Sequence, residues 1–400
     1  MDRVRKHQEK LATALLIVTI FLAGFVIGQI SSITQAQDSQ FAIGSTEQAF
    51  EPVYEVFESI RARYVNTNNV DVLTLIDGAI TGMIESLDDP YSSYMDPTSF
   101  EMFTSDLSGD VEGIGVVIRT EEETGRVVVV SLIRGAAAEA AGVLPGDIFL
   151  DVDGVSVEGL DQSQLATRVR GPQGTEVVIT FLRGEERITL TITRVRFEVP
   201  NVEYELLEGN IAYIRLGEFN DRSREQLDAA IADLDVNSRA GLIFDLRGNP
   251  GGLLSAAIDI ASIFVEEGVI IYEAFGDGSE QVFEANGNYA NITVPIVVLV
   301  NEGSASASEL VSGAMQDLGA AVLIGETTFG KGTVQTLQPL SNNGALRLTI
   351  ARYLLPSRRW IHDTGVEPNI VVPYDIVTDG ADIDPQLDAA LDYLIGNAGN

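Results

Sequence analysis

The chain has 400 residues, a hydrophobic fraction of 45% and a formal net charge of −34, which together indicate two or three folded domains with a real core. Basic residues are sparse outside the N-terminal tail, so we expect no nucleic-acid partner. With no cysteine and two histidines, a thiol nucleophile and a disulfide framework are excluded, and we expect neither a metal site nor a cofactor.

Residues 1–10 are rich in basic side chains and are expected to be a cytoplasmic tail, and residues 11–30 follow with no charged side chain. Twenty such residues can span a bilayer, and they exceed the apolar core of a usual signal peptide. No clear cleavage site follows, so an uncleaved transmembrane anchor is favoured over a cleaved signal. The basic flank predicts a single-pass protein of the cell membrane, with its folded part in a bacterial periplasm or at the cell exterior.

Residues 31–48 are polar and rich in Gln and Ser, which is typical of a linker. In residues 49–107, apolar side chains recur at helical spacing in two successive sets, which predicts an N-terminal helical module. Pro90, within L-D-D-P-Y-S-S-Y, breaks the second set. Such a module serves equally well as a packing cap on the core or as a surface for self-association into a homo-oligomer.

Residues 108–196 are rich in β-strand patterns, with a hairpin near residues 121–125 and the turn L-P-G-D between a helix and a strand. This segment resembles a PDZ domain. In such domains the backbone N–H groups of a loop, here Gly113, Ile114, Gly115 and Val116, bind the terminal carboxylate of a peptide that adds as a strand. Arg170 ends a helical stretch; it either reports occupancy of that groove to the rest of the chain or is a solvated surface arginine.

Residues 197–375 alternate strands and helices, which predicts a mixed α/β core. Strands are expected at 211–216, 241–246 and 345–356, and helices at 223–234 and 253–264. The turn R-G-N-P-G-G, with Gly251 and Gly252, opens the second helix. Its free N–H groups suit an oxyanion, whereas no phosphate-binding pattern is present. Residues 376–400 are predicted to form a terminal helix and a loose tail.

The stretch from 294 to 335 is the centre of the sequence. A Val-rich run at 294–300 predicts a buried strand, a sharp turn at N-E-G follows, and helical spacing begins after Ser306. This strand–turn–helix geometry can present a serine hydroxyl beside free helix N–H groups. Ser306 and Glu309 also fit a capping box, which would explain both residues without any chemistry.

A serine nucleophile needs a base. His7 lies in the N-terminal tail, and nothing around His362 suggests that role. Lysine occurs three times, at positions 6, 10 and 331, among 25 basic residues. Because lysine, unlike arginine, can lose its proton when it is desolvated, Lys331 between two glycines indicates a titratable amine. Phe329, Val334 and the glycines suggest a close-packed turn around it; the alternative is a chance lysine on a loop.

Together, G-S-A-S-A-S-E and G-E-T-T-F-G-K-G-T-V-Q resemble the carboxy-terminal processing (tail-specific) proteases, which are PDZ-containing Ser-Lys endopeptidases. The resemblance covers about residues 50–372, and it includes the helical module, which in this family often mediates self-association. It implies Ser306 as nucleophile, Lys331 as general base and Gln335 as the residue that orients the lysine. It further implies an oxyanion hole formed by Ala307 with either Gly251 or Gly252.

On an extended strand, Lys331 and Gln335 would lie about 13 Å apart at roughly 3.3 Å per residue, so the backbone must bend between them if Gln335 is to orient the lysine.

The expected function is a membrane-anchored serine endopeptidase whose PDZ domain selects protein substrates by an apolar C-terminus. The alternative is a non-catalytic PDZ scaffold that retains the protease fold.

Overall fold

The computed structural model describes residues 46–66, 70–121, 124–133, 135–160, 162–198, 201–374 and 383–397. The chain divides into two compact units, residues 1–79 and 80–400. The predicted basic tail and membrane span at 1–30 lie outside the described residues. Among the helices that are described, none is both long and apolar enough to cross a membrane.

The first unit contains α2 (Thr46–Arg63) and the start of α3 (Val72–Glu85). These two helices confirm the helical module expected from the apolar spacing. On α2 several apolar residues stay exposed, with 47% of Val53 and 60% of Val56 accessible, while Phe57 and Ile60 are half-buried.

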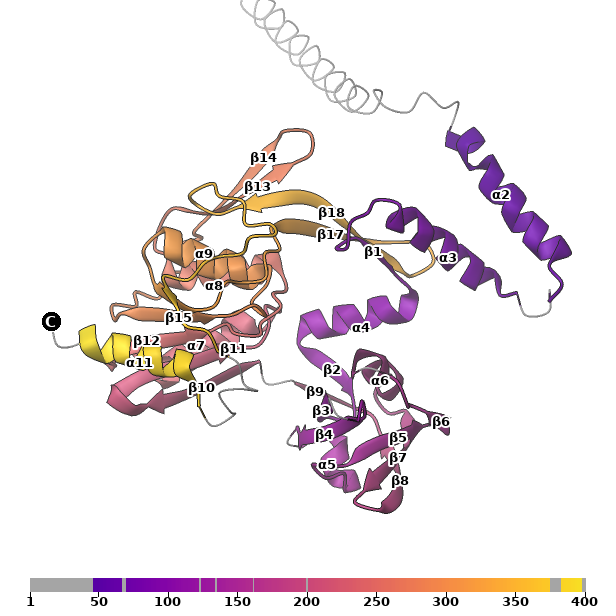
Figure 1. The fold of residues 1–400 in the computed structure, drawn as a ribbon, viewed down its shortest axis with the longest axis horizontal. Helices are drawn as coiled ribbons and strands as arrows, with labels where there is room; N and C mark the ends of the chain where they lie inside the picture. Colours follow the sequence, from indigo (N-terminus) through magenta and orange to yellow (C-terminus); the bar gives the residue numbers. More distant parts are fainter. Residues whose placement is uncertain are drawn as a thin grey trace, which may run out of the picture. The chain divides into compact units, whose positions relative to one another are not determined.

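The second unit contains a six-stranded sheet, here called the central sheet, of which several strands are labelled in Figure 1. Its spatial order is β10 (Val202–Leu207), β11 (Ile211–Leu216), β12 (Gly241–Asp245), β15 (Ile296–Val300), β16 (Val322–Gly325) and β19 (Ile370–Val371). Only β10 runs antiparallel to its neighbour; all the other pairs are parallel. Every residue of β12 and β15 is buried, as the continuous apolar runs predict for strands covered on both faces.

Helices cover both faces of this sheet. Because side chains alternate along a strand, Leu242 and Phe244 pack with α7 (Ser223–Asp233), α8 (Leu254–Phe264) and α9 (Ala307–Asp317), whereas Ile243 joins a second cluster with α11 (Pro385–Asn397). The short helices η2 (Glu208–Asn210) and η3 (Val236–Ser238) lie in the connections before β11 and β12. The mixed α/β core is confirmed, and the bounds of its predicted strands and helices differ from the observed ones by at most two residues.

An antiparallel sheet, largely unpredicted, lies beside this core. Its order is β1 (Ser93–Met95), β18 (Ala345–Leu354), β13 (Val269–Phe275) and β14 (Glu280–Glu284), and β17 (Thr333–Pro339) also pairs with β18. The helix α4 (Pro97–Ser108) follows β1 and was not predicted either. Of this layer, the sequence indicated only β18.

A separate β-rich domain is inserted between α4 and β10. Its entry strand β2 (Asp110–Gly113) pairs with its exit strand β9 (Val195–Glu198), so the insertion begins and ends at one place. Its main sheet is ordered β3 (Val116–Thr120), β4 (Val127–Leu132), β5 (Ile148–Val152), β7 (Glu176–Arg183) and β8 (Glu186–Thr193), with β6 (Val155–Ser156) paired to β5. The helices α5 (Ala137–Ala141) and α6 (Gln162–Val169) complete a hydrophobic core of its own.

Candidate active site

Three adjacent parallel strands end at one edge of the central sheet. β12 leads into the glycine-rich turn at 246–253, β15 into the serine turn at 301–306, and β16 into the loop that carries Lys331. Since parallel neighbours end at the same edge, the topology brings these three loops together from sequence positions far apart. Ser306, Lys331, Gln335, Gly251, Gly252 and Ala307 all line one cavity of about 360 Å³.

Ser306 occupies a strained backbone conformation at the start of α9. Its φ of 53° and ψ of −111° belong to a region that costs a non-glycine residue on the order of 1–3 kcal/mol. Opposite, a Cβ on Gly251 would lie 2.8 Å from the Ser306 Cβ, so only glycine fits this approach. The strained turn and the close glycine together hold the hydroxyl at the cavity.

The three serines of S-A-S-A-S have different surroundings. Ser304 is fully buried, and its hydroxyl donates to the carbonyl of Leu246 at 2.8 Å. Ser308 is also fully buried and donates to the carbonyl of Asn249 at 2.8 Å. These two bonds fasten the serine turn to the glycine-rich turn, whereas Ser306 lines the cavity.

The N–H groups of the two candidate oxyanion glycines are not equivalent. The Gly251 N–H donates to the Asn249 side-chain oxygen at 2.9 Å. The backbone of Phe219 donates to the carbonyl of Gly251 and accepts the N–H of Leu253. It makes no hydrogen bond with the N–H of Gly252. Within the described residues, no hydrogen bond uses the N–H of Gly252 or of Ala307, the first residue of α9.

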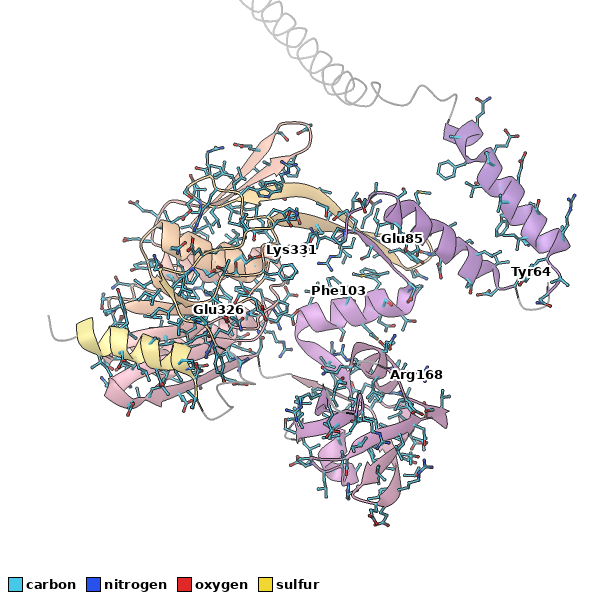
Figure 2. The ribbon with its side chains drawn as sticks, in the orientation of Figure 1. Tyr64, Glu85, Phe103, Arg168, Glu326 and Lys331 are labelled. Atoms are coloured by element: carbon cyan, nitrogen blue, oxygen red, sulfur yellow. The ribbon has the colours of Figure 1, made fainter. Side chains whose placement is uncertain are left out.

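Lys331, labelled in Figure 2, lies on the loop between β16 and β17, and its side chain is partly buried. Burial, reinforced by the charge of Arg347, lowers its pKa to about 8, although Glu309 and Asp89 oppose the shift. Its Nζ lies 5.1 Å from the centre of the Tyr91 ring. The close-packed turn is confirmed for the glycines: a Cβ on Gly332 would lie 2.8 Å from the Trp360 ring nitrogen. Phe329, however, is 56% exposed, so its predicted packing is wrong.

Glu309 joins the serine turn to the lysine loop. Its Oε2 accepts the N–H of Ser306 at 2.8 Å and the N–H of Lys331 at 2.9 Å. Its Oε1 accepts the Thr328 hydroxyl and the Gly330 N–H, both at 2.6 Å. The side chain is fully buried. The capping-box pattern thus identified one of its four bonds, and three further bonds reach 19 to 22 residues along the chain.

The pairing of β17 with β18 shifts register between Val334 and Gln335. This irregularity lies within the segment from Lys331 to Gln335, where a bend was expected. The Gln335 side-chain nitrogen donates to the hydroxyls of Thr333 at 3.0 Å and Thr349 at 3.2 Å. Gln335 therefore shares the cavity with Lys331, while its amide nitrogen is held by two threonines.

His362 lies behind the lysine loop and is not a lining residue of the cavity. Its ring stacks on Trp360 at 5.1 Å, and its Nδ1 accepts the N–H of Gly332 at 3.3 Å. These contacts give it a packing role. Within the described residues, no group of three or more acidic or histidine side chains could hold a metal ion.

Comparison with known proteins agrees with this geometry. Residues 210–372 match Peptidase family S41, 128–183 match a PDZ domain, and 23–99 match the "Activating protease CtpB N-terminal domain". Carboxy-terminal processing protease CtpA of Bacillus subtilis is 36% identical over 399 residues, covering 98% of this chain and 83% of the relative. The chain belongs to the carboxy-terminal processing protease family.

A second relative and a solved structure agree with this assignment. The carboxyl-terminal-processing protease of Synechocystis is 36% identical over 329 residues, which cover 80% of this chain and 76% of the relative. The photosystem II D1 C-terminal processing protease superposes with a TM-score of 0.51 at 29% identity, covering 82% of this chain and 94% of that chain. The protein is thus a serine-type peptidase of family S41, with a PDZ domain and an N-terminal helical module.

In the PDZ domain of this protease, β3 is an edge strand of its sheet, and an edge strand can accept a peptide as an added strand. The loop from Gly113 to Val116 leads into it. Gly115 has a φ of 77°, and a Cβ there would lie 2.1 Å from that of Ala136, so this position requires glycine. Arg170 follows α6, and its side chain lies 3.7 Å from the position that a Cβ on Gly113 would take.

Proposed function

We propose that this protease cleaves peptide bonds with a Ser306–Lys331 dyad. One observation carries the proposal: the two residues line the same cavity, and their backbone N–H groups bond to the same carboxylate oxygen of Glu309. That shared anchor fixes the loop of the nucleophile relative to the loop of the base. Rigid mutual placement of this kind is what a nucleophile and its base require.

In the first step, the Ser306 Oγ bonds to the substrate carbonyl carbon while its proton passes to the Lys331 Nζ. The N–H groups of Gly252 and Ala307 hold the oxyanion; Gly252 is preferred to Gly251 because the Gly251 N–H is engaged by Asn249. Collapse then breaks the C–N bond as Lys331 returns the proton to the leaving amine. A water molecule, deprotonated by Lys331, hydrolyses the acyl-enzyme in the same manner.

The lowered pKa supports Lys331 as the base. With a pKa of about 8, about one molecule in ten carries a neutral amine at pH 7, against fewer than about one in a thousand for an ordinary lysine. Gln335 shares the cavity and is proposed to orient the amine through its carbonyl oxygen, since its nitrogen is held by Thr333 and Thr349.

The PDZ domain is proposed to select substrates by an apolar C-terminus, with the loop from Gly113 to Val116 taking the terminal carboxylate. Arg170 lies beside Gly113 and also lines a cavity together with residues of α4. It is therefore the candidate for reporting occupancy of the groove to the core.

Amidating the C-terminus of an unfolded protein substrate is expected to slow its cleavage several-fold, because the loop loses its anionic ligand. The rates are measured with matched free and amidated substrates. A short peptide that bypasses the groove serves as control and should be unaffected. Equal rates for the two protein substrates would remove the selector role.

The proposed location is the cell membrane, with residues 11–30 as anchor and the catalytic part outside the cytoplasm. The full chain is then expected to stay with the membrane fraction after a salt wash. Release by the wash, or protection of the catalytic part on the cytoplasmic side, would contradict this location.

A further inference from the structure

Arg347 lines the catalytic cavity from strand β18, in company with Ser306 and Lys331. The guanidinium lies 5.8 Å from the centre of the Phe103 ring on α4. Figure 2 labels Phe103 and Lys331, which line the cavity from α4 and from the core. Contact with a ring occupies one face of the guanidinium and leaves its in-plane N–H donors available.

No acidic side chain in the described part of the chain forms an ion pair with Arg347, and no hydrogen bond from it is found there. Other arginines that are buried from solvent have carboxylate or carbonyl partners. Arg247 contacts Asp245 at 2.6 Å and Asp384 at 2.8 Å, and Arg194 donates to the carbonyls of Val169 and Glu176. Arg347 is thus a partly desolvated cation at the cavity, with no counterion among the residues that the structure describes.

Desolvation of Arg347 has an energetic consequence: burial lowers the pKa of its guanidinium, which means that the charged form is held at a cost. A ligand that brings a negative charge into the cavity would offset this cost. The planar fork of arginine matches a carboxylate through two parallel hydrogen bonds. A peptide can supply that group as an Asp or Glu side chain or as its C-terminal carboxylate.

We propose that Arg347 forms a carboxylate-binding subsite of the catalytic cleft, which selects peptides that place a carboxylate near the bond to be cleaved. This inference rests on the proposed function and adds a specificity that the PDZ domain does not provide. A carboxylate bound there also offsets the positive charge of Arg347, which helps to lower the pKa of Lys331. The bound carboxylate therefore does not favour the neutral amine, and we expect it to lower KM without raising kcat.

The test begins with a neutral peptide that the protease cleaves, acetylated at its N-terminus and amidated at its C-terminus. At each position in turn, a peptide with Glu is compared with the matching peptide with Gln. At one position, Glu is expected to lower KM about fivefold to tenfold, as one charge-assisted bidentate contact would. Arg347→Gln should abolish that preference, and Arg347→Lys should keep part of it. A second arm compares free and amidated ends of the neutral peptide in the wild type and in Arg347→Gln, which separates the side-chain source from the C-terminal source.

Arg352→Gln is the matched control, because Arg352 is an exposed arginine on the same strand, over the Trp360 ring; it should leave the preference intact. If Arg347→Gln slows acidic, neutral, free and amidated peptides by one common factor, the subsite is disproved. Fluorescence anisotropy measures the affinity of the same peptides for Ser306→Ala, and so detects the carboxylate preference without turnover. Failure of the dyad would thus leave this measurement valid.

Discussion

Lys331→Arg is expected to be as inactive as Ser306→Ala, with a loss in kcat on the order of 10² to 10⁴ or more, the contribution of general-base catalysis. The substitution keeps a cation and its hydrogen-bond donors in the cavity. Arginine, however, does not lose its proton in proteins and cannot accept one from Ser306. The measurement is turnover of an unfolded protein substrate, together with tail binding to show that the PDZ domain is intact.

Lys331→Met controls for folding in the same experiment. Below pH 8 the lysine is protonated in both the folded and the unfolded state, and the folded state bears the full cost of burying its charge. The methionine variant should therefore be inactive yet more stable than the wild type, by roughly 1–3 kcal/mol in view of its partial exposure. That gain should shrink as the pH rises above 8. Near-normal turnover of a folded Lys331→Arg would make the lysine structural and reopen the question of His362 as the base.

Glu309→Gln is expected to lower kcat on the order of 10²-fold, because small displacements of a base from its nucleophile cost that much. An amide has one acceptor oxygen for the four donors that now meet the carboxylate. KM should change little, since Glu309 is buried and is not a lining residue of the cavity. The unfolding free energy should fall by about 2–4 kcal/mol, so kinetics are measured where the variant remains folded.

The pH profile separates positioning by Glu309 from a loss of folded protein. Because Glu309 raises the pKa of Lys331, its neutralisation should move the rising limb of activity to lower pH. Glu302→Gln, an exposed glutamate of the same turn, should change neither rate nor profile. An unshifted profile with an undiminished kcat would show that Glu309 is only a helix cap.

Of the central sheet, β11, β12 and β15 were predictable because they are short, apolar and largely buried, whereas β10, β16 and β19 were not predicted. Apart from β18, the antiparallel layer was not predicted: β14 is mostly exposed and β17 is half-buried, and both carry many polar residues. Their pairing depends on partners far along the chain, as between β17 and β18 or β1 and β18. Local periodicity does not report such contacts.

The site was predictable where a local rule was broken. One such place is a serine at a strand–turn–helix junction. The other is a lysine between two glycines, in a chain that uses arginine almost everywhere else beyond its N-terminal tail. Tyr91 and Arg347 had no such signal, because they meet Lys331 only through the tertiary fold. Glu309 had a misleading one: its spacing from Ser306 fits a helix cap, which conceals the bonds to Thr328, Gly330 and Lys331.

The most direct test of the dyad is the rate at which a fluorophosphonate probe labels the full-length protease as a function of pH, with the labelled residue identified by peptide mapping. The probe must attach to Ser306, and the rate should rise through pH about 8, following the neutral fraction of Lys331. Lys331→Arg should not be labelled. Attachment to another residue, or a rate in Lys331→Arg equal to that of the wild type, would contradict the proposal that Lys331 activates Ser306.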